Sequence, residues 1–226
     1  SRTDSEQAEV IGLRVRTSDE EVHHLRVPDR SGEDLRGTRN SRHWNAALLE
    51  ELSEADGLVL FLRPASVRPG EPVSELAALV DSSSAAAGDE NERPWDPSMM
   101  PTDVSMVDAL QELSLAADRE SFPIAVIISA WDEAEAESPM QWMHDRVPLL
   151  AQFLETNSGK RPFEVFGVSV QGAAFAQPKD DGEADAMVIE IDAAEPDPWE
   201  RATCVDAAGN DRELVGPLVW LLRGGG

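Results

Sequence analysis

Three short polar segments, each directly after an apolar stretch, hold the residue types that could bind a charged ligand. The first, residues 28–33, contains Asp29 and Gly32 and follows the alternating residues 22–27. An aspartate there could hold Mg²⁺ through its water shell, and a glycine offers an unhindered backbone N–H to a terminal phosphate. An ordinary Asp/Gly turn has the same composition, so this segment alone leaves both interpretations open.

The other two segments hold an aspartate and a serine. Asp132 follows the apolar run 124–128, and its carboxylate could accept two hydrogen bonds from the ring N–H and the exocyclic amine of guanine, a pair that adenine cannot supply. Alone, Asp132 is better explained as the cap of the next helix. Ser169 follows residues 165–168, where a backbone N–H could meet the guanine oxygen. Alone, this segment is better explained as the point where a strand passes into a loop.

Each segment needs a strand before it, and the sequence predicts those strands. Residues 9–16 and 21–27 alternate apolar and polar side chains, and their short link predicts an antiparallel hairpin. Residues 57–62, 123–129 and 164–168 are apolar runs, typical of strands buried on both faces. We expect all five strands in one sheet, and all but the first to share one direction.

Between and after these strands, apolar residues recur at helical spacing. It predicts helices around residues 44–55, 107–117 and 140–154. A last helix is predicted at 217–223, with proline near its start and glycine after its end. The order predicts an α/β fold, with a mostly parallel sheet, helices on both faces and an antiparallel hairpin at the edge.

Composition limits the partners and the compartment. The 226 residues carry a net charge of −25, a field that repels the phosphates of nucleic acids and anionic membrane surfaces, so neither is expected as a partner. The single cysteine, Cys204, cannot form an internal disulfide, and no signal peptide or long apolar run is present, which favours the cytoplasm. His23 and His24 are adjacent on a strand and point to opposite faces, so they cannot chelate one metal ion.

The chain is expected to form a single domain, residues 1–226, with two stretches outside its core. Residues 82–101, rich in Ser, Ala, Pro and acidic side chains, predict a flexible insertion. Residues 173–211 predict an acidic insertion before the C-terminal helix, in which residues 187–191 could pair with 202–205.

Taken together, the three polar segments follow successive strands in the order found in GTPases. The stretches DRSGE (29–33), SAWD (129–132) and VGPLVWLL (215–222) resemble the translation-factor class of Ras-like P-loop GTPases. Within that class they are most similar to the bacterial double-GTPase domains of conflict and defence operons. The resemblance covers residues 8–172 and 212–223, and it implies a GTP-binding switch with Mg²⁺ as cofactor and a protein partner.

The resemblance also implies roles for single residues. Asp29 matches the Mg²⁺-linked aspartate and Gly32 the glycine at the γ-phosphate, while Glu33 stands where many relatives have the water-positioning glutamine. On the base side, Asp132 matches the guanine-reading aspartate, Ser129 occupies the place of the usual Asn or Thr, and Ser169 matches the serine of the last nucleotide loop.

The sequence also departs from the family pattern. Ala130 replaces the usual lysine whose stem packs on guanine, Trp131 either packs there instead or is buried structurally, and Val170 replaces alanine. The printed sequence contains no Walker A motif, GxxxxGK[ST]; Ser158-Gly159-Lys160 is followed by arginine and precedes a predicted strand. We therefore expect tight GTP binding and GTPase activity only if the parent protein supplies a Walker A segment. The alternative is a non-catalytic pseudo-GTPase that serves as an interaction scaffold.

Overall fold

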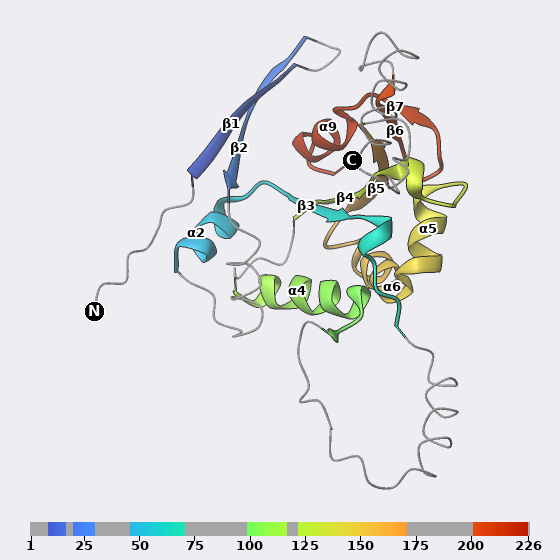
Figure 1. The fold of residues 1–226 in the computed structure, drawn as a ribbon. Coiled ribbons are helices and arrows are strands. Elements are labelled where there is room, and N and C mark those ends of the chain that lie inside the picture. The colour runs from blue at the N-terminus through green and yellow to red at the C-terminus, as the bar shows by residue number, and fades with distance from the viewer. Residues whose placement is uncertain are drawn as a thin grey trace, which may run out of the picture.

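The computed structural model describes residues 9–16, 20–29, 46–70, 99–116, 122–170 and 201–225. Within them the strands form two sheets, a two-stranded hairpin and a five-stranded sheet with the order β3-β4-β5-β6-β7 (Figure 1). The architecture is α/β, as predicted.

The hairpin consists of β1 (Glu9–Arg16) and β2 (Val22–Asp29), which pair antiparallel with Leu13 opposite Leu25. This confirms the predicted hairpin, but the prediction that it belongs to the same sheet as the later strands is wrong. In the described part of the chain β2 pairs with β1 alone, and Figure 1 shows the hairpin standing apart from the larger sheet. An alternating pattern specifies an extended segment with one buried face, and it does not specify the neighbouring strand.

The larger sheet begins with three parallel strands. β3 (Leu58–Leu62), β4 (Ile124–Ser129) and β5 (Phe163–Ser169) are in register, with Ile124 between Leu58 and Phe163. The shared direction of these three strands is confirmed.

Two short antiparallel strands extend the sheet beyond β5. β6 (Thr203–Val205) pairs with β5 on one side and with β7 (Asp211–Arg212) on the other. The predicted extended conformation of residues 202–205 is thus confirmed for 203–205, while residues 187–191, the partner suggested by the sequence, lie outside the described residues.

Helices α2 (Ala46–Glu54), α4 (Thr102–Ala116) and α9 (Gly216–Leu222) form where the sequence predicts them. The single helix predicted over 140–154 is wrong. The chain instead forms α5 (Pro139–Arg146) and α6 (Pro148–Asn157), separated by Val147 at φ −140°, ψ 57°. Proline disfavours the helical conformation of the residue before it, so Pro148 ends one helix and starts the next.

Helices cover both faces of the parallel strands, as predicted. On one face Ile124, Val126 and Ile128 of β4 lie in a core cluster with side chains of α4, α5 and α6. On the other face Ala125 and Phe166 pack with Trp220 of α9. Figure 1 shows α4 and α9 on opposite sides of the sheet.

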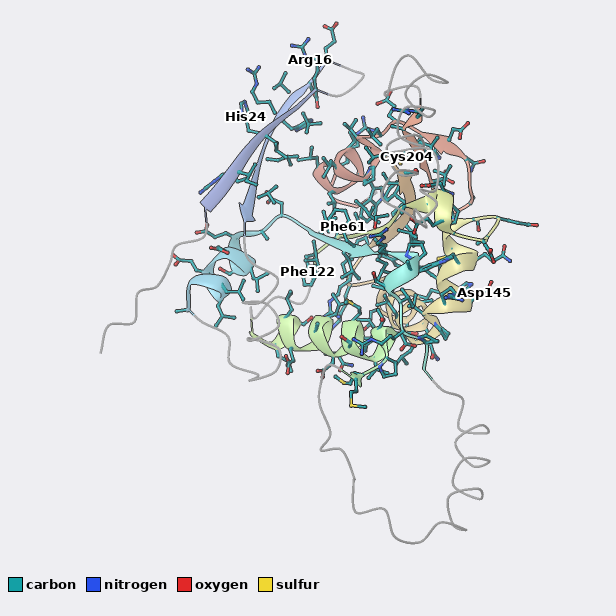
Figure 2. All side chains as sticks on the ribbon, viewed as in Figure 1. Arg16, His24, Phe61, Phe122, Asp145 and Cys204 are labelled. Carbon is teal, nitrogen blue, oxygen red and sulfur yellow. The ribbon has the colours of Figure 1, made fainter. Side chains whose placement is uncertain are left out.

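Strand β3 lies at the edge of the five-stranded sheet. Leu62 is buried in the core and Leu58 and Leu60 pack against it, but Phe61, on the alternate face, is 65% exposed (Figure 2). The expectation that β3 is buried on both faces is therefore wrong at Phe61. In the described part of the chain only β4 pairs with this strand.

Most of the two predicted insertions, residues 82–98 and 173–200, lies outside the described residues, so the division into core and insertions stays a prediction. None of the helices in the described ranges has the length and apolar character that crossing a bilayer requires.

Candidate functional site

The carboxyl ends of β3, β4 and β5 meet at one edge of the sheet because the three strands are parallel. Open parallel sheets bind ligands at this edge. Two of the predicted site residues close their strands here, Ser129 at the end of β4 and Ser169 at the end of β5. The hydroxyl of Ser129 donates a hydrogen bond to the carbonyl oxygen of Leu62, 3.3 Å away, and so ties β4 to the end of β3.

Directly after β4 the chain reverses through an unusual backbone conformation. Ala130 adopts φ 53°, ψ 51°, which lies in the left-handed region. Residues other than glycine adopt this conformation at a cost of about 1–2 kcal/mol. A 3₁₀ turn, η3 (Trp131–Glu133), follows, closed by the N–H of Glu133 donating to the Ala130 carbonyl at 2.9 Å. This reversal places Asp132 beside the end of β5.

Asp132 and Ser169 are in direct contact. The Ser169 hydroxyl donates a hydrogen bond to Oδ1 of Asp132. Ser169 is buried, at 1% exposure, whereas Asp132 is exposed. No hydrogen bond to Oδ2 of Asp132 occurs within the described residues, and this side chain presents its carboxylate to solvent.

The helix cap that the sequence suggested for Asp132 is formed by another residue. Ser138 is the N-cap of α5, and its hydroxyl oxygen accepts from the Gln141 N–H at 3.3 Å. The capping interpretation of Asp132 is therefore wrong, and its side chain is directed to β5 instead.

A second link joins η3 to β3. Arg63 directly follows β3, and its guanidinium lies 3.5 Å from the carboxylate of Glu133. Because Arg63 is 59% exposed, such a pair adds less than about 1 kcal/mol to stability.

The Trp131 ring packs against the backbone of Gly167 in β5. A β-carbon built on Gly167 would lie 2.5 Å from Cδ2 and 2.7 Å from Cγ of that ring. Trp131 is partly buried and also packs against the main core, so the structure gives it a packing role, and its contact with a base stays a prediction. Gly167 was not among the predicted site residues, although a glycine inside an apolar strand signals a close approach of another group.

The side chains of the remaining predicted site residues lie outside the described structure. Asp29 is the last residue of β2, and its side chain lies outside the description. Gly32 and Glu33 also fall outside the described residues, so their roles stay predictions.

The rejected Walker A candidate has a structural role. Residues 158–160 form the turn that ends α6, before β5. The Arg161 guanidinium that follows lies 5.6 Å from the ring centre of Phe122 and 6.0 Å from that of Phe153, a cation–π arrangement. This segment therefore ends α6 and leads to Arg161, which packs against the two aromatic rings.

A groove of about 540 Å³ lies away from this edge, between β5, the β6–β7 pair and α9. Glu164 and Phe166 of β5 line it, together with Asp206, Arg212 and Trp220. Burial raises the pKa of Glu164, and the hydrogen bond from the backbone N–H of Ala207 offsets only part of this rise.

Asp206 organises the turn between β6 and β7. Its Oδ1 accepts from the backbone N–H groups of Ala208 and Asn210, both at 3.0 Å, and its Oδ2 lies 2.6 Å from Arg212. Burial alone would raise the pKa of Asp206, but these hydrogen bonds and the guanidinium outweigh it and hold the pKa below its ordinary value. Burial also raises the pKa of the neighbouring Cys204 thiol to about 11, which makes it unreactive.

The groups that a guanine nucleotide would need are present in part. The exposed carboxylate of Asp132, with one oxygen held by Ser169, suits a ligand that presents two adjacent N–H donors. Among the described residues, no three His, Cys, Asp or Glu side chains lie close enough together to hold a metal ion.

Comparison with known protein families identifies a relationship that covers most of the chain. A family model described as Double-GTPase 1 (DO-GTPase1) matches residues 1–221. No curated protein and no solved structure matches the chain. The matched range includes every residue of the edge formed by β3, β4 and β5.

Proposed function

The chain belongs to the Double-GTPase 1 family, and from this premise we propose that it is a guanine-nucleotide-binding switch domain with a Ras-like fold. The observation that carries the proposal is the hydrogen bond between Ser169 and Asp132 at the carboxyl edge of the parallel strands. It joins two residues that the sequence assigns to two separate base-reading loops.

The topology supports the Ras-like part of the proposal. A hairpin precedes three parallel strands in the order β3-β4-β5, with α4, α5 and α6 on one face and α9 on the other. A Ras-like sheet has one further strand, which leads into the phosphate loop. The unpaired edge of β3 in the described part of the chain leaves room for such a strand.

At the base, Asp132 would discriminate guanine from adenine by charge and donor pattern. Its carboxylate accepts hydrogen bonds and donates none, so it favours a base edge with two N–H donors and disfavours adenine, whose ring nitrogen is an acceptor. The Ser169 hydroxyl, held by β5, fixes the orientation of that carboxylate.

The phosphate end of the proposal rests on the sequence. Asp29 would hold Mg²⁺, Gly32 would donate its backbone N–H to the terminal phosphate, and Glu33 would orient a water molecule. Mg²⁺, when bound, neutralises phosphate charge, which matters in a chain with a net charge of −25.

The test is a titration of GDP and ADP into the chain, followed by amide NMR, with Asp132→Asn as the variant. Base contacts alone give a dissociation constant on the order of 1 mM. We expect about a tenfold preference for GDP, lost in the variant because an amide cannot accept both N–H groups. Asp145→Asn, an exposed site on α5, is the matched control (Figure 2). Equal binding of GDP and ADP by the unaltered chain would refute the proposal.

The alternative, an interaction scaffold that has lost nucleotide dependence, is favoured by one observation. Ala130 lacks the lysine stem that covers guanine in relatives, and Trp131 is turned inward against Gly167, so neither covers a base. A scaffold would bind its protein partner with the same affinity in the presence and absence of GTP. In either case we propose a cytoplasmic role with a protein partner, in a bacterial conflict or defence system.

A further inference from the structure

The contact between Trp131 and Gly167 lies beside the base-reading carboxylate, and it has a strict steric requirement. Gly167 lies within β5, and its φ is not in the left-handed region, so its backbone conformation does not call for glycine. The surrounding space does require glycine, because a β-carbon at this position would come within 3 Å of three atoms of the Trp131 ring.

The turn that carries Trp131 contains a strained residue. Ala130 holds a left-handed conformation, which turns the next residue inward onto β5. The Ala134 N–H then donates to the Trp131 carbonyl at 3.0 Å and closes the turn around Asp132. Such strain persists only where the surroundings over-determine it, and here the packing of the indole ring supplies that constraint.

We infer that Trp131, packed on Gly167, is a positioning residue that sets the preference for guanine by holding the Asp132 carboxylate in place. This role rests on the proposed function, and it identifies the residue that fixes the specificity of nucleotide binding. Asp132 is exposed, and among the described residues its side chain has Ser169 as its one hydrogen-bond partner. The Ser169 hydroxyl holds one oxygen of the carboxylate, and the backbone that carries Asp132 is held through its neighbours in η3, of which Trp131 is the one packed on β5.

A structural role alone would affect stability and leave the choice of base unchanged. The inference instead requires that loosening the ring changes the ratio of GDP to ADP binding while the fold is kept. It also requires the change to appear without nucleotide, as a displacement of the amide signals of residues 131–133 and 167–169.

The experiment compares Gly167→Ala and Trp131→Ala with Gly159→Ala by amide NMR on the full chain. Gly159 is the matched control because a β-carbon there meets nothing within 4 Å. We expect both test variants to shift the signals of residues 131–133 and to reduce the preference for GDP over ADP about tenfold, and the control to do neither. Trp131→Ala introduces no collision, so it decides the question if Gly167→Ala does not fold.

The outcomes separate the two proposals. If the unaltered chain binds GDP and ADP equally, the proposed function fails, whatever the variants do. If it prefers GDP and folded Trp131→Ala keeps the full preference, the positioning role is overturned while the function stands. Trp131→Phe, which retains an aromatic ring over Gly167, is expected to retain part of the preference, and its complete loss would also contradict the inference.

Discussion

Replacing Asp206 with alanine should destabilise the chain by about 3 kcal/mol. The carboxylate accepts two backbone N–H groups at 3.0 Å, each contributing about 1 kcal/mol net, and the Asn210 amide lies 3.2 Å from both oxygens. The pair with Arg212 adds under about 1 kcal/mol, since that side chain is 53% exposed. Asp206→Asn keeps an oxygen acceptor for the backbone and should cost about 1 kcal/mol.

The assay is the midpoint of urea unfolding, followed by far-UV circular dichroism at pH 7 and then at falling pH. Because the folded pKa of Asp206 is lowered, its contribution is complete above the ordinary aspartate range and is lost as the pH falls through the folded value. The difference between the unaltered chain and Asp206→Asn should therefore vanish in acid. Arg212→Ala is the control for the ion pair. If Arg212→Ala costs as much as Asp206→Ala, the turn hydrogen bonds do not carry the stability and the reasoning fails.

Two further predictions concern the same region. Glu164→Gln should raise the unfolding midpoint at pH 7 and not in acid, because the pKa of Glu164 is raised in the folded chain and stability is lost as the pH rises through that folded value. Glu213→Gln, an exposed position in the same groove, is the control for the change in net charge, and an equal rise in its midpoint would contradict the prediction. Gly209→Ala should cost at least about 1 kcal/mol more than Gly224→Ala in chemical unfolding. Both glycines have positive φ, but only at Gly209 does a new β-carbon meet backbone, 2.9 Å from the Glu137 carbonyl oxygen; equal costs would show that this contact relaxes freely.

The sequence predicted the parallel strands and the polar residues at their carboxyl ends well because both are local signals, while the base-reading role of those residues stays a prediction. An uninterrupted apolar run such as 124–128 reflects burial on both faces, and the polar residue that ends it must lie at the sheet edge. Asp132 and Ser169 could therefore be placed at one edge before their contact was known.

The rest depended on contacts between distant segments. The alternation of β2 does not specify its neighbour, which in the described part of the chain is β1 alone. The pairing of β6 with β5 could not be predicted either, because strands of two or three residues have too few side chains to show a period. The contact of Trp131 with Gly167 likewise becomes evident only when β4 and β5 are side by side. The break at Pro148 is different: its signal was in the sequence, and the helical spacing on either side concealed it.

The two edge strands of the five-stranded sheet differ in how readily they could pair with a further strand. One end, β7, is two residues long and carries Asp211 and Arg212, features that discourage further strands. The other end, β3, is five apolar residues without a charge, and Phe61 stands exposed on it. Any additional strand, from this polypeptide or from another, will therefore join beside β3. The net charge of −25 opposes the approach of separate copies, so salt that screens this repulsion is expected to favour any association of the isolated chain through that edge.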